Sequence, residues 1–252
     1  MVPRCIFFFT VAFGLPLLEA ADFHKIYDRA PSRSITILTW HGDIRLSSYD
    51  GNSVEVSAVK KGPDRDLVEI QEGGGGNRIH LFSRYLDSKR NNAAVDYEIR
   101  VPKGIFYDNI HLKSNSGTIT VEDVAGSIRL ETVGRAIEVR DVEGTLIATS
   151  VSGDVNGYLK QTTHRNMLRF SSSSGNVVVH ALADLNAQVH LESASGQLKT
   201  EFPLETKELR YGPGKFAHGK LGTGNQVLEA RSVFGAVNLL KKPLESVEKN
   251  GK

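Results

Sequence analysis

Cysteine is almost absent from this sequence of 252 residues, since the only one, Cys5, lies in an apolar N-terminal stretch. If that stretch is removed, the remaining chain has no thiol for a disulfide, a metal ligand or a nucleophile. Long segments with helical periodicity are also missing, which argues against a helical domain. The formal net charge is only +2, so nothing favours a nucleic acid or an anionic membrane surface as partner.

Motifs of catalysis and metal binding are equally scarce. The eight histidines form no HxH or HExxH pattern, and we interpret them as surface residues. The run 73–76 lacks the Lys-Ser/Thr pair and the helix of a phosphate loop, so it indicates a hairpin tip. No GxSxG is present. We therefore assign no catalytic, cofactor-binding or metal-binding residue and no cofactor, and we expect a protein that is not an enzyme.

Glycine, by contrast, is plentiful, with 24 residues, and it marks a repeat. The residues two positions after, five before and seven before each repeat corner are apolar, and the residue three before is Ser or Thr. The corner positions are Gly42, Gly117, Arg135, Gly153, Gly175, Gly196 and Gly235. Because a tight bend often requires a positive φ, we interpret the six glycines as structural turn residues. Arg135 breaks the row and indicates a different turn.

The spacing of the repeat predicts the fold. Apolar positions that differ by two are typical of strands, and the central corners are 18, 18, 22 and 21 residues apart. Short strands repeated at this period indicate a stacked array in which each unit completes the core of the next. We predict an all-β fold, a parallel β-solenoid or β-helix of about 18–22-residue coils, with like residues stacked on like.

Two rows beside the corner are ambiguous. The hydroxyl row three before the corner shares the parity of the apolar rows, so we expect it to point inward and bond to neighbouring backbone. An outward ladder that contacts a sugar is the alternative. The row two before the corner has outward parity, and we expect the N-terminal excursion to cover it. The apolar members of this second row are Trp40, Val133, Val151, Ala194 and Val233.

The chain divides into four parts by composition. Residues 1–20 have a basic start, an apolar run and a small residue for cleavage, which predicts a secretory signal peptide, with an uncleaved anchor as the alternative. Residues 21–105 form an N-terminal β part with a hairpin excursion around 73–76, residues 106–240 the coils, and residues 241–252 a polar tail. We expect residues 202–221, which contain two prolines, to form a long loop or an irregular coil. The mature chain has no segment that predicts a transmembrane span.

The order of these motifs resembles a known family. TWHGDIRL followed by SVEVSAVK, the VP before the first Ser-Gly corner, the string of Ser-Gly corners and GTGNQVLEARSVFGAV are similar to the bacterial DUF4097 family, related to the DUF2807 or head-GIN group. Its members are β-strand-repeat proteins often labelled adhesins from their fold. The resemblance covers most of the mature chain. It implies a β-solenoid-like fold, export to the cell envelope and no established catalytic residue.

Three functions remain open at this stage. The first is a non-enzymatic envelope protein, an adhesin or surface-binding scaffold in the periplasm, on the cell surface or secreted, whose partner is unknown and could be a glycan or an envelope protein. The second is a polysaccharide-active enzyme, which needs converging carboxylates, whereas Glu131 and Glu192 are separated by Thr149 and Ser171 in the coils between them. The third is a periplasmic scaffold or sensor partner that uses the apolar row.

Overall fold

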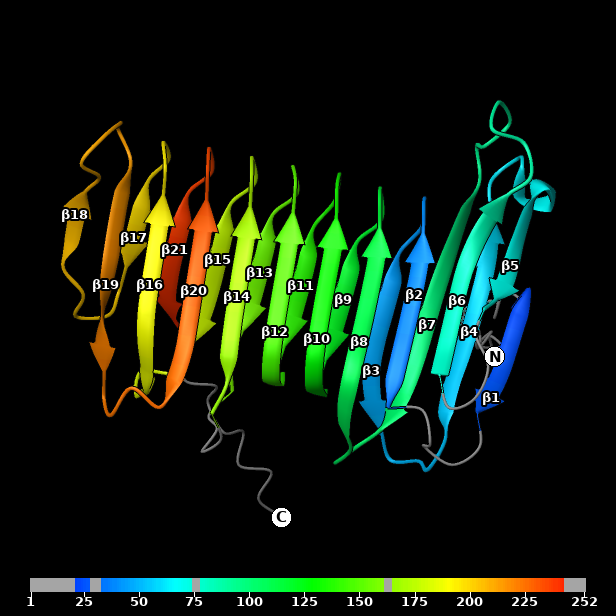
Figure 1. Ribbon diagram of the computed structural model, residues 1–252, viewed down its shortest axis with the longest axis horizontal. Helices are drawn as coiled ribbons and strands as arrows, with labels where there is room; N and C mark the ends of the chain where they lie inside the picture. The colour runs from blue at the N-terminus through cyan, green and yellow to red at the C-terminus, as the bar shows by residue number, and fades with distance from the viewer. Residues whose placement is uncertain (1–20, 28–32, 74–77, 161–164, 243–252) are drawn as a thin grey trace, which may run out of the picture.

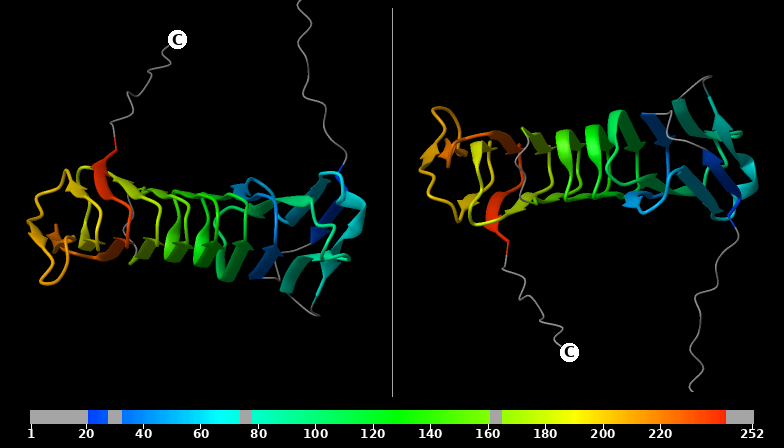
Figure 2. Two further views of the ribbon diagram at one scale, coloured as in Figure 1. Left: turned by 90° about the horizontal axis from the view of Figure 1, so that it is seen from above. Right: turned by 90° about the horizontal axis from the view of Figure 1, so that it is seen from below.

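The computed structural model of the protein describes residues 21–27, 33–73, 78–160 and 165–242, and this part of the chain is all-β. Its strands form two long open sheets of ten and eleven strands, and one short 3₁₀ helix, η1 (Arg65–Leu67), interrupts them. Figure 1 shows the strands side by side along the long axis, and Figure 2 shows the two sheets as facing layers. The prediction of an all-β fold is therefore confirmed.

The first sheet, here sheet A, is parallel in its centre and antiparallel at one end. In spatial order it contains β1 (Phe23–Tyr27), β4 (Val54–Lys61), β7 (Ala94–Pro102), β3 (Ile44–Tyr49), β9 (Ile119–Glu122), β11 (Ile137–Arg140), β13 (Val155–Tyr158), β15 (Val177–Ala181), β21 (Val237–Lys241) and β17 (Leu198–Thr200).

The second sheet, here sheet B, has antiparallel pairs at both ends. In spatial order it contains β18 (Thr206–Glu208), β19 (Lys215–Leu221), β16 (Ala187–Ser193), β20 (Gln226–Ser232), β14 (Met167–Ser172), β12 (Glu143–Ser150), β10 (Ala125–Thr132), β8 (Phe106–Ser114), β2 (Ser34–Thr39), β6 (Arg78–Tyr85) and β5 (Val68–Glu72).

Each coil consists of a sheet B strand, a turn, and a sheet A strand. Neighbouring coils pair in the register that the repeat predicts: Ile128 lies beside Ile110 and Leu146 in sheet B, and Ile137 lies beside Ile119 and Val155 in sheet A. The early strands β2 and β3 stack directly on β8 and β9, as expected from the matching frame. The inward aliphatic rows are almost completely buried and form one continuous core between the sheets.

The order of the last coils differs from the order of the sequence. The final coil, β20–β21, lies between β14–β15 and β16–β17, so that the Gly235 corner separates the Gly175 and Gly196 corners. In addition, the segment 202–221 is not a loop or an irregular coil. It contains β18 and β19, and β19 pairs antiparallel with β16 on the far side of sheet B. The prediction of a loop was wrong because it relied on the Gly and Pro residues near β19 and gave too little weight to the strand alternation of β19 itself.

The buried hydroxyl row is confirmed, and it forms a hydrogen-bond ladder along the stack. Ser172 Oγ donates to the carbonyl of Gly153 in the adjacent coil at 2.9 Å and accepts the amide of its own corner, Gly175, at 2.9 Å. The residue itself is only 5% exposed. The same pair of bonds recurs at Ser114, Ser150, Ser193 and Ser232. Each of these serine hydroxyls is thus satisfied twice, which offsets the cost of burying it.

The corner glycines have a different cause from the one expected. Among the six, only Gly42 has a positive φ, +117°. At Gly153 a Cβ would lie 1.8 Å from the carbonyl oxygen of Arg135, and at the other four corners it would lie 1.7–2.2 Å from a neighbouring carbonyl. The close approach of stacked backbones therefore excludes a side chain. Arg135 itself has an exposed side chain.

Several predictions concern segments outside the described residues. These are the signal peptide at 1–20, the tip at 74–76 of the hairpin formed by β5 and β6, and most of the polar tail. The hairpin itself is confirmed, because β5 and β6 pair antiparallel. Within the described ranges, no helix has the length and apolar character needed to cross a membrane.

Candidate binding surface along the turn edge

The turns that join sheet B to sheet A line up along one edge of the molecule, at the top in Figure 1. We call this the turn edge. It contains the three residues that end at each corner, from 40–42 at one end of the stack to 194–196 at the other. Because each coil contributes the same three positions, the turn edge is a regular surface.

The turn edge exposes five apolar side chains, four of them two positions before the corner and Phe234 one position before it. Trp40 is 59% exposed, Val151 is 48%, and Phe234 is 68%. Val133 and Val233 are equally open, at 45% each. We call these five residues the apolar edge. The expectation that the N-terminal excursion covers the row two before the corner, which also includes the half-buried Ala194, was wrong, because the excursion continues the two sheets beyond β2 and β3 instead of folding back over the turns.

Backbone hydrogen bonds hold the apolar edge rigid. The amide of Ser152 donates to the carbonyl of Val133, and the amide of Ser174 donates to the carbonyl of Val151, both at 2.9 Å. The amide of Phe234 continues the ladder by donating to the carbonyl of Ser173 at 2.9 Å. The side chains are therefore presented by a hydrogen-bonded frame and not by independent loops. Such a preformed surface loses little conformational entropy on binding.

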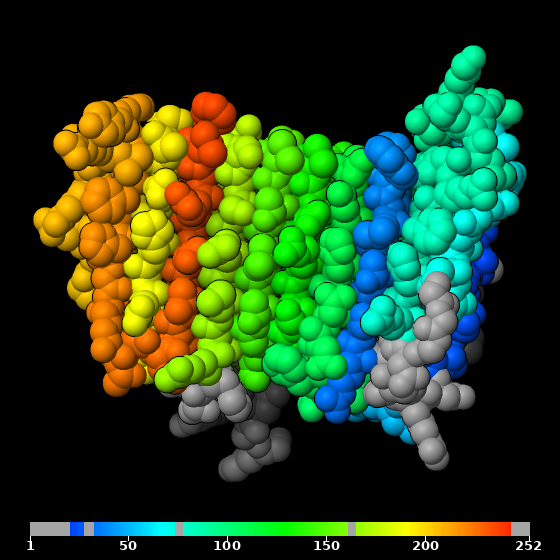
Figure 3. Space-filling model, viewed as in Figure 1, coloured from blue at the N-terminus to red at the C-terminus, as the bar shows by residue number. Residues whose placement is uncertain are grey.

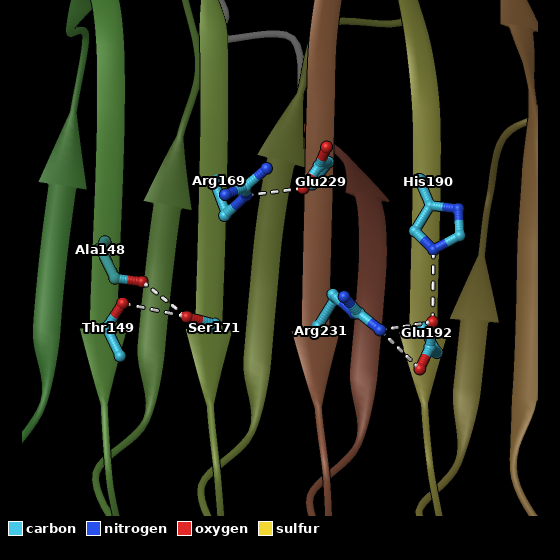
Figure 4. Close-up of polar contacts among 8 residues, drawn as sticks. All are labelled: Ala148, Thr149, Arg169, Ser171, His190, Glu192, Glu229 and Arg231. Atoms are coloured by element: carbon cyan, nitrogen blue, oxygen red, sulfur yellow. Dashed lines mark hydrogen bonds and ion pairs between the residues drawn. The ribbon is translucent and has the colours of Figure 1, made fainter.

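The outer face of sheet B, shown in Figure 3, has a different character. Near the C-terminal end, Arg169 Nε lies 2.6 Å from Glu229 Oε2, and Arg231 bonds to both carboxylate oxygens of Glu192 at 2.9 Å. Figure 4 shows these pairs, together with the neutral contact between Thr149 and Ser171. The inserted coil creates both ion pairs, because it brings Glu229 beside Arg169 and Arg231 beside Glu192.

The ion pairs stabilise the charged forms of these side chains. The hydrogen bond from Arg169, together with its charge, outweighs the effect of burial and holds the pKa of Glu229 below its ordinary value. Both side chains remain partly exposed, so the pair contributes little to stability. The face is thus a solvated, charge-balanced surface near the C-terminal end.

The histidines of sheet B lie where the sequence places them, on the outward face. His111 and His190 belong to one row across the sheet, and His218 of β19 lies directly opposite His190. Burial lowers the pKa of His111, although Glu131 at 3.6 Å acts in the opposite direction. Among the described residues, no three His, Cys, Asp or Glu side chains are grouped so as to hold a metal ion.

Carboxylates do gather in a groove of about 500 Å³ on the outer face of sheet A, lined by Asp43, Asp96, Glu98 and Glu138 among others. Asp43 accepts the amide of Thr118 at 2.7 Å, and Asp96 accepts the amide of Asp43 at 2.8 Å. Glu138 pairs with Arg140. The first two carboxylates therefore accept backbone amides, and the same bond recurs from Asn176 to Asp154 one residue after the corner, which indicates a structural role. The sequence did not predict this groove because β7, which follows the excursion, lies beside β3 only in the folded sheet.

Taken together, these features define an all-β protein of stacked strand pairs with one exposed, apolar turn edge. The chain belongs to the Toastrack DUF4097 family, whose model matches residues 27–239. The resemblance found in the sequence is thereby confirmed. The comparison with curated proteins found no match.

Three solved structures are similar over most of their length. A candidate cell adhesion protein from Clostridium sporogenes is 12% identical, with 87% of this chain and 98% of that chain covered and a TM-score of 0.49. A candidate adhesin from Bacteroides fragilis is 14% identical, with 86% and 96% covered and a TM-score of 0.35. A candidate lipid-binding protein from Parabacteroides distasonis is 12% identical, with 86% and 96% covered and a TM-score of 0.38.

Proposed function

We propose that this chain is a non-enzymatic exported protein of the bacterial cell envelope, a β-solenoid that serves as an adhesin or binding scaffold. The observation that carries this function is the apolar edge. Apolar side chains that stay exposed along one edge, while the aliphatic rows of the repeat are buried, mark a surface that contacts another molecule. Membership of the DUF4097 family and the signal-like residues 1–20 support export.

The rigidity of the stack supports binding as opposed to catalysis. The turn edge is held by a continuous backbone ladder and the buried hydroxyl row, so it presents a fixed pattern of side chains over the length of the molecule. The partner that suits such a surface is extended, such as a glycan chain or another envelope protein. In the periplasm the same surface would serve a scaffold or sensor partner.

Localisation is the experiment that tests export. The full chain carries a C-terminal tag, and intact cells are treated with protease before the tag is followed by immunoblot. Loss of the tag signal on intact cells would support a surface-exposed adhesin. Protection until the outer layer is opened would support a periplasmic scaffold, whereas a signal confined to the cytoplasmic fraction would contradict export in either form.

A second candidate function is a polysaccharide-active enzyme, and the carboxylate groove on sheet A is the feature that favours it. Of its acidic side chains, Glu98 is exposed on the outward face of β7. Incubation of the full chain with a panel of polysaccharides, followed by analysis of released sugars, tests this function. Product formation that is lost in Glu98→Gln would support the enzyme, and absence of product across the panel would remove it.

A further inference from the structure

Two depressions flank Trp40 at the N-terminal end of the apolar edge. One, of about 510 Å³, lies toward the segment after β6 and is lined by Tyr85, Ser88 and Asn91 among others. The second, of about 520 Å³, lies toward β8 and is lined by His80, Lys113 and Asn115 among others. Both share Trp40 and Phe82, so they form one surface, which we call the Trp40 groove.

The floor of the Trp40 groove is aromatic. Phe82 and His80 point outward from β6 with their rings 5.7 Å apart, and Trp40 rises beside them from the neighbouring coil. An exposed ring such as that of Trp40, beside the partly exposed rings of His80 and Phe82, suits the C–H faces of sugar rings, whose hydroxyl groups bond to polar side chains at the rim. Ser88, Asn91 and Asn115 supply such groups. The groove spans β6, β2 and β8, roughly 10 Å at normal strand spacing, which is the scale of a short oligosaccharide.

The walls of the groove are fixed before any ligand binds. Tyr85 donates its hydroxyl proton to the carbonyl of Ala93 at 3.0 Å, which ties together the two ends of the segment after β6. The ring of Tyr85 also packs edge-on against His41 at 5.8 Å. His41 in turn bonds through Nδ1 to Ser116 Oγ at 2.6 Å. A preformed site of this kind needs little ordering when it binds.

Charge in and around the groove is unbalanced. No acidic residue lines either depression in the described part of the chain, whereas Lys113 and Arg84 do line them. Arg84 has Glu69 opposite it on β5. Lys113, however, shares the single carboxylate of Glu131 with Arg129, at 3.7 and 3.6 Å. At the other end of the same face, Arg169 and Arg231 each have a glutamate of their own.

We propose that the Trp40 groove binds an acidic polysaccharide, with a uronate sugar stacked on Trp40 and its carboxylate directed toward Lys113. The excess positive charge at the groove attracts an anion, and the aromatic floor selects a sugar ring over a bare ion. This inference deepens the proposed function because it gives the binding surface a ligand class. It depends on the groove alone and not on Val133, Val151 or Val233.

Trp40 makes the test direct, because it is the only tryptophan in the chain. Its fluorescence is followed while oligogalacturonate, oligomannuronate or a hyaluronan fragment is added to the full chain. The methyl-esterified oligogalacturonate has the same rings without the charge and serves as the ligand control. We expect at least one acidic oligosaccharide to shift the emission, with an affinity that falls as NaCl rises from about 0.05 M to about 0.5 M.

Calorimetry with variants completes the test. Trp40→Ala is expected to abolish the heat of binding, and Lys113→Gln to weaken affinity about tenfold. Arg169→Gln, which removes a cation from the balanced end of the same face, is the matched control and is expected to bind like the parent. Thermal unfolding of each variant shows that the fold is retained, as expected for partly exposed side chains.

Three results would overturn the proposal. These are no response to any of the three acidic oligosaccharides, equal binding of the esterified control, and equal loss of affinity in Arg169→Gln and Lys113→Gln. A stronger Trp40 response to phosphatidylglycerol vesicles than to the oligosaccharides would assign the groove to a membrane surface instead. None of these results affects export, which the protease experiment measures separately.

Discussion

Two neighbouring positions of each coil have opposite environments. Three residues before the corner, the side chain is a hydroxyl and is buried; one residue later, it is often apolar and is exposed. At the Gly153 corner these are Ser150, which is 1% exposed, and Val151, which is 48% exposed. In these two adjacent residues the polar side chain is buried and the apolar side chain is exposed, which is the reverse of the usual distribution.

The contrast between the buried hydroxyl row and the exposed apolar edge indicates which of the two stabilises the fold. The serine hydroxyls of this row are held by two backbone bonds each and are therefore part of the stack. The apolar edge makes no contribution to the core that would explain its composition. The buried serines of this row are thus structural, and the exposed valines and aromatics are the candidates for function.

The corner glycines should give the largest effect of any test of the stack. Gly153→Val places a Cβ 1.8 Å from the Arg135 carbonyl oxygen, so the coils must separate. We expect a loss of about 3 kcal/mol or more in the free energy of unfolding, measured with urea. Gly134→Ala is the control, because the nearest atom to its Cβ position outside the adjoining residues is the carbonyl oxygen of Asn115, at 3.6 Å. Equal effects of the two substitutions would show that close stacking does not determine the corner.

The hydroxyl row should give the next largest effect. Ser172→Ala leaves the carbonyl of Gly153 and the amide of Gly175 without their side-chain partner, at a cost of about 1–3 kcal/mol. Ser173→Ala changes the exposed residue that follows and is expected to alter stability by less than about 0.5 kcal/mol. Chemical denaturation of both variants separates the rows, and a smaller loss for Ser172→Ala than for Ser173→Ala would contradict the structural role.

The ion pairs on sheet B should contribute less than the hydroxyl row. Arg169 lowers the pKa of Glu229, so the stabilisation is fully present above the ordinary value of 4.5 and is lost as the pH falls through the lower folded-state pKa. We expect Glu229→Gln to cost under about 1 kcal/mol near pH 6. Thermal unfolding should show that the difference in stability between Glu229→Gln and the parent shrinks as the pH drops below 4.5. A difference that grows toward acid pH would contradict the ion pair.

The apolar edge should give the smallest effect on stability. Val151→Asp is expected to change the free energy of unfolding by less than about 0.5 kcal/mol, because the side chain already faces solvent. Val155→Asp, at a fully buried position of the same coil, is the matched variant and should prevent stable folding. Circular dichroism during heating measures both. Severe destabilisation by Val151→Asp would mean that the edge is covered.

Much of the stack could be predicted from sequence because register is a local property. The apolar rows of each coil must face the core, and a shift by one residue would expose all of them. Ile128 beside Ile110 and the inward Ser172 follow from that rule. The order of the coils does not follow, because Leu228 and Val189 present similar side chains and fit either position in the stack.

The candidate site was less predictable because it too depends on which strands lie side by side, and the local repeat does not determine this. The position of Trp40 in its coil was clear, but its exposure depends on where the excursion lies, and that is set by pairing between distant strands. The pair of Arg231 with Glu192 requires the inserted coil, which the sequence order hides. Periodicity thus determines which way a side chain points, whereas the topology decides what lies beside it.

Binding by the apolar edge is the central claim, and one measurement tests it most directly. The full chain and the quadruple variant Trp40→Ser/Val133→Ser/Val151→Ser/Val233→Ser, which changes only exposed side chains, are each mixed with isolated bacterial cell envelopes, and the fraction that sediments with the envelopes is measured. Both proteins should unfold at nearly the same temperature. We predict that the parent sediments with the envelopes and that the quadruple variant stays in solution. Equal sedimentation of two folded proteins would contradict the account.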